Sequence, residues 1–140
     1  MKSVPKRESQ NGFTLVEMLL VVSIIGIMFS ISLPISMAMY NNYKASLKAQ
    51  EVMVFVSSLR RDAFLYSERK ILSSKNNIMT INGKENDFAG INLQIKEPIE
   101  FFRNGTTSGG AIKISVGDQV YKLNVLAPVG DLALSRGDEI

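Results

Sequence analysis

Glu17 is the residue whose surroundings most clearly indicate a specific chemical role, because it is a carboxylate inside an apolar segment. No charged residue occurs from Met18 to Tyr43, and about 20 apolar residues in a helix cross a hydrocarbon layer of roughly 30 Å. We therefore interpret this segment as a membrane span. An ionised side chain near the middle of a bilayer costs on the order of 2.5–3.5 kcal/mol. The carboxylate either reaches the headgroups or is kept for a positively charged partner met in an assembly.

Residue types that commonly carry catalysis or metal binding are scarce. The chain has no cysteine and no histidine, which excludes disulfides and thiolate metal sites and removes the usual general base. The glycine-rich loop at residues 103–110 is not a phosphate-binding loop, because neither Gly-Lys-Ser/Thr nor a predicted helix follows it. Asp131, Asp138 and Glu139 are too few and too spread for calcium, which needs about six to eight oxygen ligands. We expect no enzyme, no cofactor and no metal site.

The segment before the apolar run is polar and basic. Residues 1–12 carry three basic side chains and one acidic side chain and end in Asn11-Gly12. Their removal reduces the formal charge from +3 to +1. Basic residues before a membrane span favour a cytoplasmic amino terminus, so we expect the bulk of the chain on the other side of the inner membrane.

One long helix should position Glu17. We expect it to run from Phe13 to about Ser67, roughly 80 Å at 1.5 Å per residue. Beyond Tyr43 the helix becomes amphipathic, with an apolar stripe at spacings of three and four: Ala45, Ala49, Val52, Phe55, Val56, Leu59, Ala63 and Tyr66. Gly26 and Pro34 weaken the lower part of the helix.

Alternating apolar residues predict strands in the last part of the chain. The clearest strands are 91–95, 111–116 and 119–126, the last two pairing as a hairpin through Gly117-Asp118. Shorter candidates are 78–81, 99–102 and 129–134, and residues 73–77 are interpreted as a connection. About 65 residues of strand cannot easily bury a core alone, so the helix stripe should cover them. The predicted fold class is α+β, with one long amino-terminal helix packed against a small antiparallel β-sheet head.

Residues 12–22, Gly-Phe-Thr-Leu-Val-Glu-Met-Leu-Leu-Val-Val, resemble the class III signal sequence of type IV pilins and type II secretion pseudopilins. The resemblance implies that a prepilin peptidase cuts between Gly12 and Phe13 and methylates the new amino terminus at Phe13. Glu17 would then pair with the ammonium of Phe13 in a neighbouring subunit, and breaking such a buried pair is costly. The resemblance also assigns Pro34 as a point near which the helix can kink or melt, and Gly26, which weakens a helix by itself, is the second candidate kink position.

A looser resemblance covers about the last 40 residues. Phe101-Phe102, the glycine turn, residues 111–114 and residues 121–125 are similar to the GspH/FimT-like head domain. Asp131 stands where members of that family often carry an arginine after the glycine aligned with Gly130. The resemblance therefore does not extend to a role tied to that basic residue.

These observations together predict four segments: a cleaved leader (1–12), a transmembrane assembly helix (13–43), an amphipathic helix covering the head (44–70) and a periplasmic β-rich head (76–140). The resemblance implies a type IV pilin-like fold and a minor pseudopilin of a type II secretion system near the tip of its filament, with a FimT-like minor type IV pilin as the alternative. A membrane-anchored periplasmic enzyme is a remote alternative from another class. Its partners would be other pilin or pseudopilin subunits, the prepilin peptidase, an inner-membrane assembly platform and the lipid bilayer. The mixed charge of residues 136–139 argues against nucleic acid.

Overall fold

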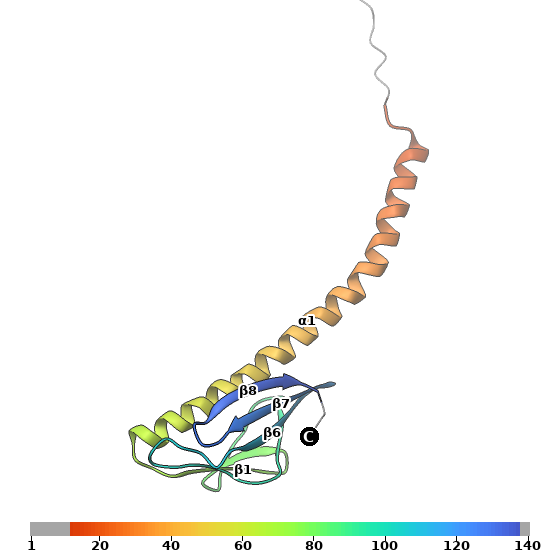
Figure 1. Cartoon of the computed structure of the whole chain (residues 1–140). Coiled ribbons are helices and arrows are strands. Elements are labelled where there is room, and N and C mark those ends of the chain that lie inside the picture. Colours follow the sequence, from red (N-terminus) through yellow and green to blue (C-terminus); the bar gives the residue numbers. More distant parts are fainter. Residues whose placement is uncertain (1–11, 138–140) are drawn as a thin grey trace, which may run out of the picture. The chain divides into compact units, whose positions relative to one another are not determined.

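The computed structural model describes residues 12–137 and contains one long helix followed by strands (Figure 1). The helix, α1, runs from Leu15 to Leu65. The strands are β1 (Lys70–Lys75), β2 (Ile78–Ile81), β3 (Lys84–Asn86), β4 (Asn92–Ile95), β5 (Ile99–Phe101), β6 (Gly110–Val116), β7 (Gln119–Leu126) and β8 (Asp131–Arg136). The chain divides into two compact units, Met1–Tyr40 and Asn41–Ile140. The described part of the first unit is almost entirely helix, and the second holds the last turns of α1 and all of the strands.

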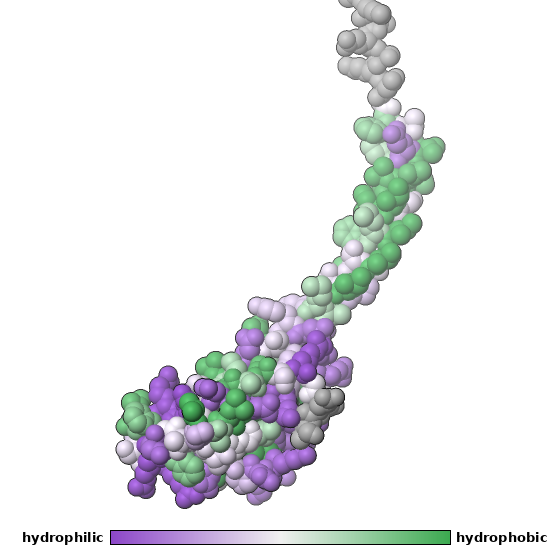
Figure 2. All heavy atoms as spheres, in the orientation of Figure 1, coloured by the Kyte–Doolittle hydropathy of each residue, from purple (hydrophilic) through white to green (hydrophobic). Residues whose placement is uncertain are grey.

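The helix of the first unit is apolar on every side. All residues from 12 to 40 are exposed, and Figure 2 shows this part of α1 as a mostly apolar surface. It is long and apolar enough to cross a membrane. A helix that is hydrophobic on all sides is normally surrounded by lipid or other protein, because exposing so much apolar surface to water is unfavourable.

Both ends of α1 lie two residues inside the predicted bounds, at Leu15 and Leu65. At the carboxyl end, Ser67 takes a left-handed conformation with φ of 52°. The amide of Glu68 donates to the carbonyl of Ala63 at 3.0 Å, and that of Ser67 donates to Phe64 at 3.3 Å. This is the hydrogen-bond pattern that commonly ends helices at a glycine. Because a serine takes the place of the glycine, the sequence shows no clear stop signal here.

The second unit contains two four-stranded antiparallel sheets, where the sequence predicted one small sheet. The first sheet has the order β3-β2-β1-β5 and the second has the order β4-β6-β7-β8. The predicted hairpin is confirmed: β6 pairs with β7 from Gly110 opposite Val125 to Val116 opposite Gln119. The α+β class and a type IV pilin-like architecture, with the helix packed on antiparallel sheets, are confirmed.

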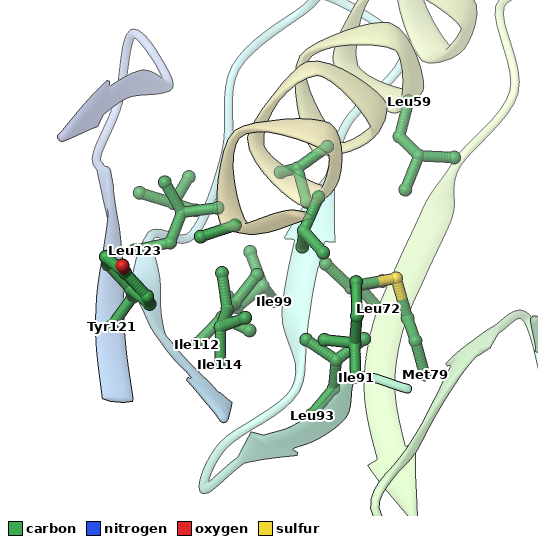
Figure 3. Close-up of a cluster of buried hydrophobic side chains, with 14 of the residues drawn as sticks. Leu59, Leu72, Met79, Ile91, Leu93, Ile99, Ile112, Ile114, Tyr121 and Leu123 are labelled. Carbon is green, nitrogen blue, oxygen red and sulfur yellow. The ribbon is translucent and has the colours of Figure 1, made fainter. Parts of the chain in front are cut away.

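The core of the second unit lies between α1 and both sheets (Figure 3). The helix contributes one stripe of buried side chains: Ala45, Ala49, Val52, Val56, Leu59 and Ala63. The sheets contribute Leu72, Met79, Leu93, Ile99, Phe101, Ile112, Ile114, Tyr121, Leu123 and Val125. Three of these helix residues are alanines, four and fourteen residues apart, and their small side chains let the helix backbone approach the sheets closely. The predicted cover over the strands is therefore present.

The apolar stripe predicted for α1 is wrong at its carboxyl end, Tyr66, and only partly right at Phe55. Tyr66, expected to be buried, is 70% exposed because α1 has already ended at Leu65. Phe55 is half-buried and packs edge-on against Phe88 with ring centroids 5.1 Å apart. The buried face is therefore narrower than the apolar pattern predicted.

The prediction that residues 73–77 form a connection is wrong for its first three residues. These belong to β1, which pairs with both β2 and β5. The hydroxyl of Ser73 lies 2.6 Å from that of Thr80, and the hydroxyl of Ser74 accepts from the amide of Ile95 at 2.8 Å. These polar side chains bond within the sheets, so a strand with a loop-like sequence is stable. The charged edge strand β3 was not predicted either.

Candidate assembly site at the start of the helix

The predicted cleavage junction lies immediately before α1. Gly12, Phe13 and Thr14 are not helical and are exposed, and Phe13 retains 74% of its accessible surface. Nothing lies within 4 Å of the position a side chain would take at Gly12. A peptide bond in an exposed, non-helical segment is open to a protease, so the geometry suits the predicted cut.

Thr14 caps the helix that begins with Leu15. Its hydroxyl oxygen accepts from the amide of Glu17 at 3.2 Å, and its carbonyl accepts from the amide of Met18 at 3.1 Å. Residues 14–17 read Thr-Leu-Val-Glu, the spacing of a capping box in which a glutamate occupies the third helical position. Such a cap is worth about 0.5–2 kcal/mol. Sequence reasoning passed over Thr14, although the Thr-x-x-Glu spacing was visible.

The carboxylate of Glu17 lies in the first turn of α1 and is exposed. A negative charge there is favourable because the unpaired amides of a helix start carry partial positive charge. Glu17 takes part in none of the ion pairs described between residues 12 and 137, which are Arg69–Glu100 and Lys70–Glu68. Its exposed position is therefore compatible with a positive partner on another chain.

Gly26 and Pro34, the predicted kink positions, both lie inside α1, which continues through them. Proline has no N–H, so the carbonyl of Ser30 receives no hydrogen bond from residue 34. The hydroxyl of Ser23 donates to the carbonyl of Leu19 at 2.8 Å, and other serines of this segment bond to their own helix in the same way. These bonds satisfy the hydroxyls without water, as a membrane segment requires. Kinking at Gly26 and Pro34 stays a prediction.

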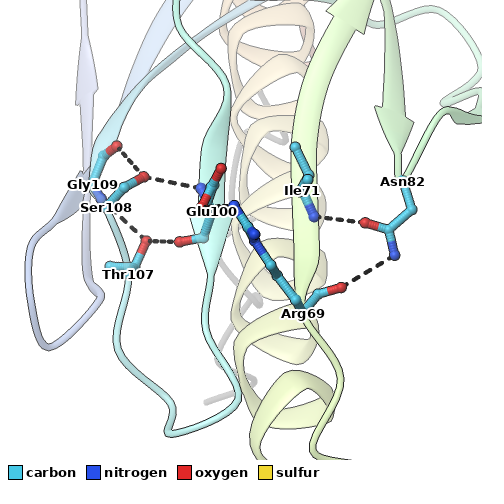
Figure 4. A network of polar contacts seen from close by, with 7 residues as sticks. All are labelled: Arg69, Ile71, Asn82, Glu100, Thr107, Ser108 and Gly109. Atoms are coloured by element: carbon cyan, nitrogen blue, oxygen red, sulfur yellow. Dashed lines mark hydrogen bonds and ion pairs between the residues drawn. The ribbon is translucent and has the colours of Figure 1, made fainter.

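The glycine-rich loop before β6 forms structural contacts with β5 (Figure 4). The hydroxyl of buried Thr107 donates to the carbonyl of Glu100 at 2.8 Å, and that of Ser108 accepts from the amide of Glu100 at 2.9 Å. The amide of Ser108 donates to the same Glu100 carbonyl at 3.0 Å. These polar groups thus hold the loop against the sheet.

The part of the chain that the structure describes contains no cluster of side chains able to hold a metal ion. Between residues 12 and 137, no group of three or more acidic side chains is arranged to hold an ion. Of the calcium candidates weighed from the sequence, Asp131 is exposed at the start of β8. Asp138 and Glu139 lie outside the described residues, as do the basic side chains of the leader.

Comparison with known families gives one match: the prokaryotic N-terminal methylation motif, over residues 7–33. No curated protein and no solved structure matches the chain. The motif covers the junction, Thr14, Glu17 and the first half of the apolar helix. It supports a type IV pilin-like or pseudopilin subunit, processed by a prepilin peptidase and assembled with other pilin subunits. The motif and the apolar helix also fit a membrane-anchored pilin.

Proposed function

We propose that this pilin-like subunit is a minor pseudopilin of a type II secretion system, resembling the H type. The observation that carries the proposal is the methylation motif joined directly to an apolar helix and followed by a β-rich unit. The looser likeness of the last 40 residues to GspH/FimT-like heads supports the minor type. The subunit sits in the inner membrane with its head in the periplasm, and then enters a short filament near the tip. It is a structural part of a machine that moves folded proteins outward.

Processing by the prepilin peptidase creates the group that Glu17 needs. Hydrolysis of the peptide bond after Gly12 gives Phe13 a new amino group, which is then methylated and stays positively charged. In its own chain this ammonium would lie beside the positive end of the helix. A neighbouring subunit's Glu17 carboxylate is the more favourable partner, because the pair removes two lone charges from lipid.

The Thr-x-x-Glu spacing offers a second role for the Glu17 side chain, since in a capping box this side chain accepts from the backbone amide of the capping residue. Two substitutions separate the roles. Glu17→Val removes both the charge and the capping group, whereas Glu17→Gln removes the charge and keeps a side chain suited to the capping box. If pairing dominates, both variants insert and are cleaved normally but lose crosslinking to neighbouring subunits. The loss reflects the cost of an unpaired buried charge, about 3–5 kcal/mol.

The matched control is Glu51→Gln, which removes an exposed carboxylate from the upper part of α1. It should crosslink as the unmodified chain does. Normal crosslinking by Glu17→Gln together with weak crosslinking by Glu17→Val would assign Glu17 to capping and contradict the assembly role.

The cleavage position is tested separately. Gly12→Ala should block processing, because the resemblance places the cut after this glycine. The measurement is the amino-terminal sequence of membrane-extracted protein. A mature chain that still begins at Phe13 in this variant would refute the assignment.

A FimT-like minor type IV pilin is the second candidate, and one surface favours it. Arg69, Phe102 and Arg103 line a shallow hollow at the end of β5. Guanidinium groups and an aromatic ring are the groups that contact phosphates and bases. Glu100 lies 2.5 Å from Arg69 and neutralises one of these charges, so we rank this candidate second. Salt-sensitive gel-shift of DNA by the detergent-solubilised chain, lost in Arg103→Gln, would reverse the ranking.

A further inference from the structure

β8 forms one edge of the second sheet (Figure 1). It pairs with β7 on one side, over the six residues from Asp131 to Arg136. A strand at a sheet edge presents a row of unpaired backbone amides and carbonyls, and such a row is a template for a further strand. Whether other parts of the chain cover this row therefore decides what β8 can bind.

The direction of the backbone groups of β8 follows from its last contact with β7. The amide of Gly137 donates to the carbonyl of Val120 at 3.0 Å, in the register of the β7–β8 pair. In an antiparallel pair, hydrogen-bonded positions alternate with positions that are not hydrogen-bonded. The amides and carbonyls of residues 131, 133 and 135 thus point to β7, and those of residues 132, 134 and 136 point outward. Among the residues that the structure describes, none bonds to the backbone groups of these outward positions.

The other sheet edges are covered or charged. At β4, the amide of Leu93 donates to the carbonyl of Asn77 at 2.8 Å, and Ser74 accepts from the next outward amide. At β5, residues 107 and 108 bond to the amide and the carbonyl of Glu100. β3 has three residues, two of them charged. These are the usual protections against further pairing. The four central residues of β8, Leu-Ala-Leu-Ser, have neither a cover nor a charge.

A shallow hollow of about 360 Å³ lies beside the start of β8, within the second unit. Its walls include Met53 and Val54 of α1 and Leu132 of β8. Leu132 and Leu134 pack against the core, so side chains of an added strand that lie on the same face also point toward α1. Val54 is 65% exposed, and an apolar side chain from an added strand would cover it.

The hollow is basic. Arg60 and Arg61 both line it, against one acidic residue, Asp131. The guanidinium of Arg60 donates to the carbonyl of Val129, and Arg61 is exposed. Neither arginine belongs to an ion pair described between residues 12 and 137. An acidic side chain near the start of β8 would therefore complement this charge.

The β8 strand of a second copy is a poor match for this edge. The antiparallel register that pairs all three outward positions sets Leu134 opposite Leu134 and Arg136 of the second copy opposite Leu132. That arginine would lie beside Arg60 and Arg61, where like charges repel. The two-fold axis of such a pair also makes the α1 segments of the two second units antiparallel. Subunits anchored in one membrane by the same end have parallel helices. A segment of a different protein meets neither obstacle.

We propose that β8 binds an extended segment of a different protein as a fifth strand of the second sheet. The added strand is antiparallel to β8, as in all strand pairs described here. Its backbone bonds to residues 132, 134 and 136, and its alternate side chains give specificity. It carries an apolar residue opposite Leu134 and an acidic residue opposite Leu132, toward Arg61. This edge is the same whether the subunit serves secretion or a pilus.

Hydrogen exchange of the full chain in detergent, followed by NMR, tests this proposal with a synthetic peptide. The peptide reads Thr-Thr-Thr-Val-Thr-Glu-Thr, with blocked ends, and places its valine opposite Leu134 and its glutamate opposite Leu132. Without peptide, the outward amides of Leu132 and Leu134 should exchange much faster than those of Ala133 and Ser135. With peptide, exchange at the two outward amides should slow several-fold. The control is the same peptide N-methylated at its valine and glutamate, which cannot donate to β8.

Three results would overturn the proposal. The first is unchanged exchange at Leu132 and Leu134 at the solubility limit of the peptide. The second is equal slowing by the N-methylated peptide, which would indicate contact without strand addition. The third is slow exchange at these amides before any peptide is added. In that case the edge is already covered, by a second copy if dilution of the chain restores fast exchange.

The preference for an acidic residue has its own variant. Arg61→Gln should raise the Kd of the glutamate peptide several-fold and change little the Kd of a peptide with glutamine in its place. The matched control is Lys84→Gln, which removes a positive charge from exposed β3 of the other sheet and should leave both values unchanged. An unchanged Kd for the glutamate peptide in Arg61→Gln would contradict the acidic preference.

Discussion

Replacing Leu59 with alanine removes a side chain that α1 contributes to the core of the second unit. Leu59 is 6% exposed and belongs to the cluster that includes Leu72 and Met79 (Figure 3). Burying a leucine side chain contributes about 1.5–3 kcal/mol, and the cavity left behind raises the usual cost of truncation to about 2–5 kcal/mol. We expect Leu59→Ala to lower the free energy of unfolding of this unit by about 3 kcal/mol.

Leu47→Ala is the matched control, since it makes the same change in the same helix. Leu47 is 46% exposed, so about half of its surface already meets water and no closed cavity forms. The helix propensity of the two changes is equal, and we expect Leu47→Ala to cost about 1 kcal/mol or less.

Urea unfolding of the full chain in detergent measures both variants. Near-ultraviolet circular dichroism of tyrosine follows the second unit, because Tyr121 is 5% exposed whereas Tyr40, Tyr43 and Tyr66 are exposed. Equal costs for Leu59→Ala and Leu47→Ala would refute the conclusion that the helix stripe forms the core of this unit.

Two further predictions concern a glycine and an ion pair. Gly110→Ala should cost about 1–3 kcal/mol more than Gly83→Ala in the same unfolding assay. Both glycines have positive φ (154° and 81°), but only at Gly110 would the new Cβ lie 2.7 Å from a side-chain carbon of buried Ile99, and equal costs would contradict this. The Lys70 ammonium, which donates to the carboxylate of Glu68 at 2.6 Å, holds the pKa of Glu68 below its ordinary value. The Lys70–Glu68 pair therefore contributes to stability at pH values above the pKa that Glu68 has in the unfolded chain, and this contribution is lost as the pH falls through the pKa of Glu68 in the folded chain. Carboxyl NMR should show the pKa of Glu68 rising in Lys70→Gln, and an unchanged pKa would refute the pairing.

Much of the candidate assembly site was readable from the sequence. Gly12, Phe13 and Glu17 are neighbours along the chain, so their relation does not depend on how distant segments fold. The methylation motif over residues 7–33 supports the same class of protein. The capping role of Thr14 is also local, and the Thr-x-x-Glu spacing would have found it. Cleavage after Gly12 and pairing by Glu17 stay predictions.

Strands with a clear alternation were also predictable. β2 matches its predicted bounds, and β6 and β7 are displaced by at most one residue. In these strands apolar residues alternate with polar ones because one face is buried and the other is exposed. β1 was not predicted because its serines, Ser73 and Ser74, form hydrogen bonds with Thr80 and Ile95 on other strands. The local sequence of β1 does not indicate such partners.

The sequence by itself determined the apolar helix with its single acid at Glu17, the amphipathic stripe that follows it in the chain and the α+β class, and it predicted the leader junction. Each of these depends on composition or spacing within one segment. Only the tertiary structure decided that the strands divide into two sheets, that β1 pairs with β5, and that Lys113 faces Lys122 beside Gly137. Pairing between distant strands depends on the total burial and hydrogen bonding of the whole unit, which no single stretch of sequence encodes.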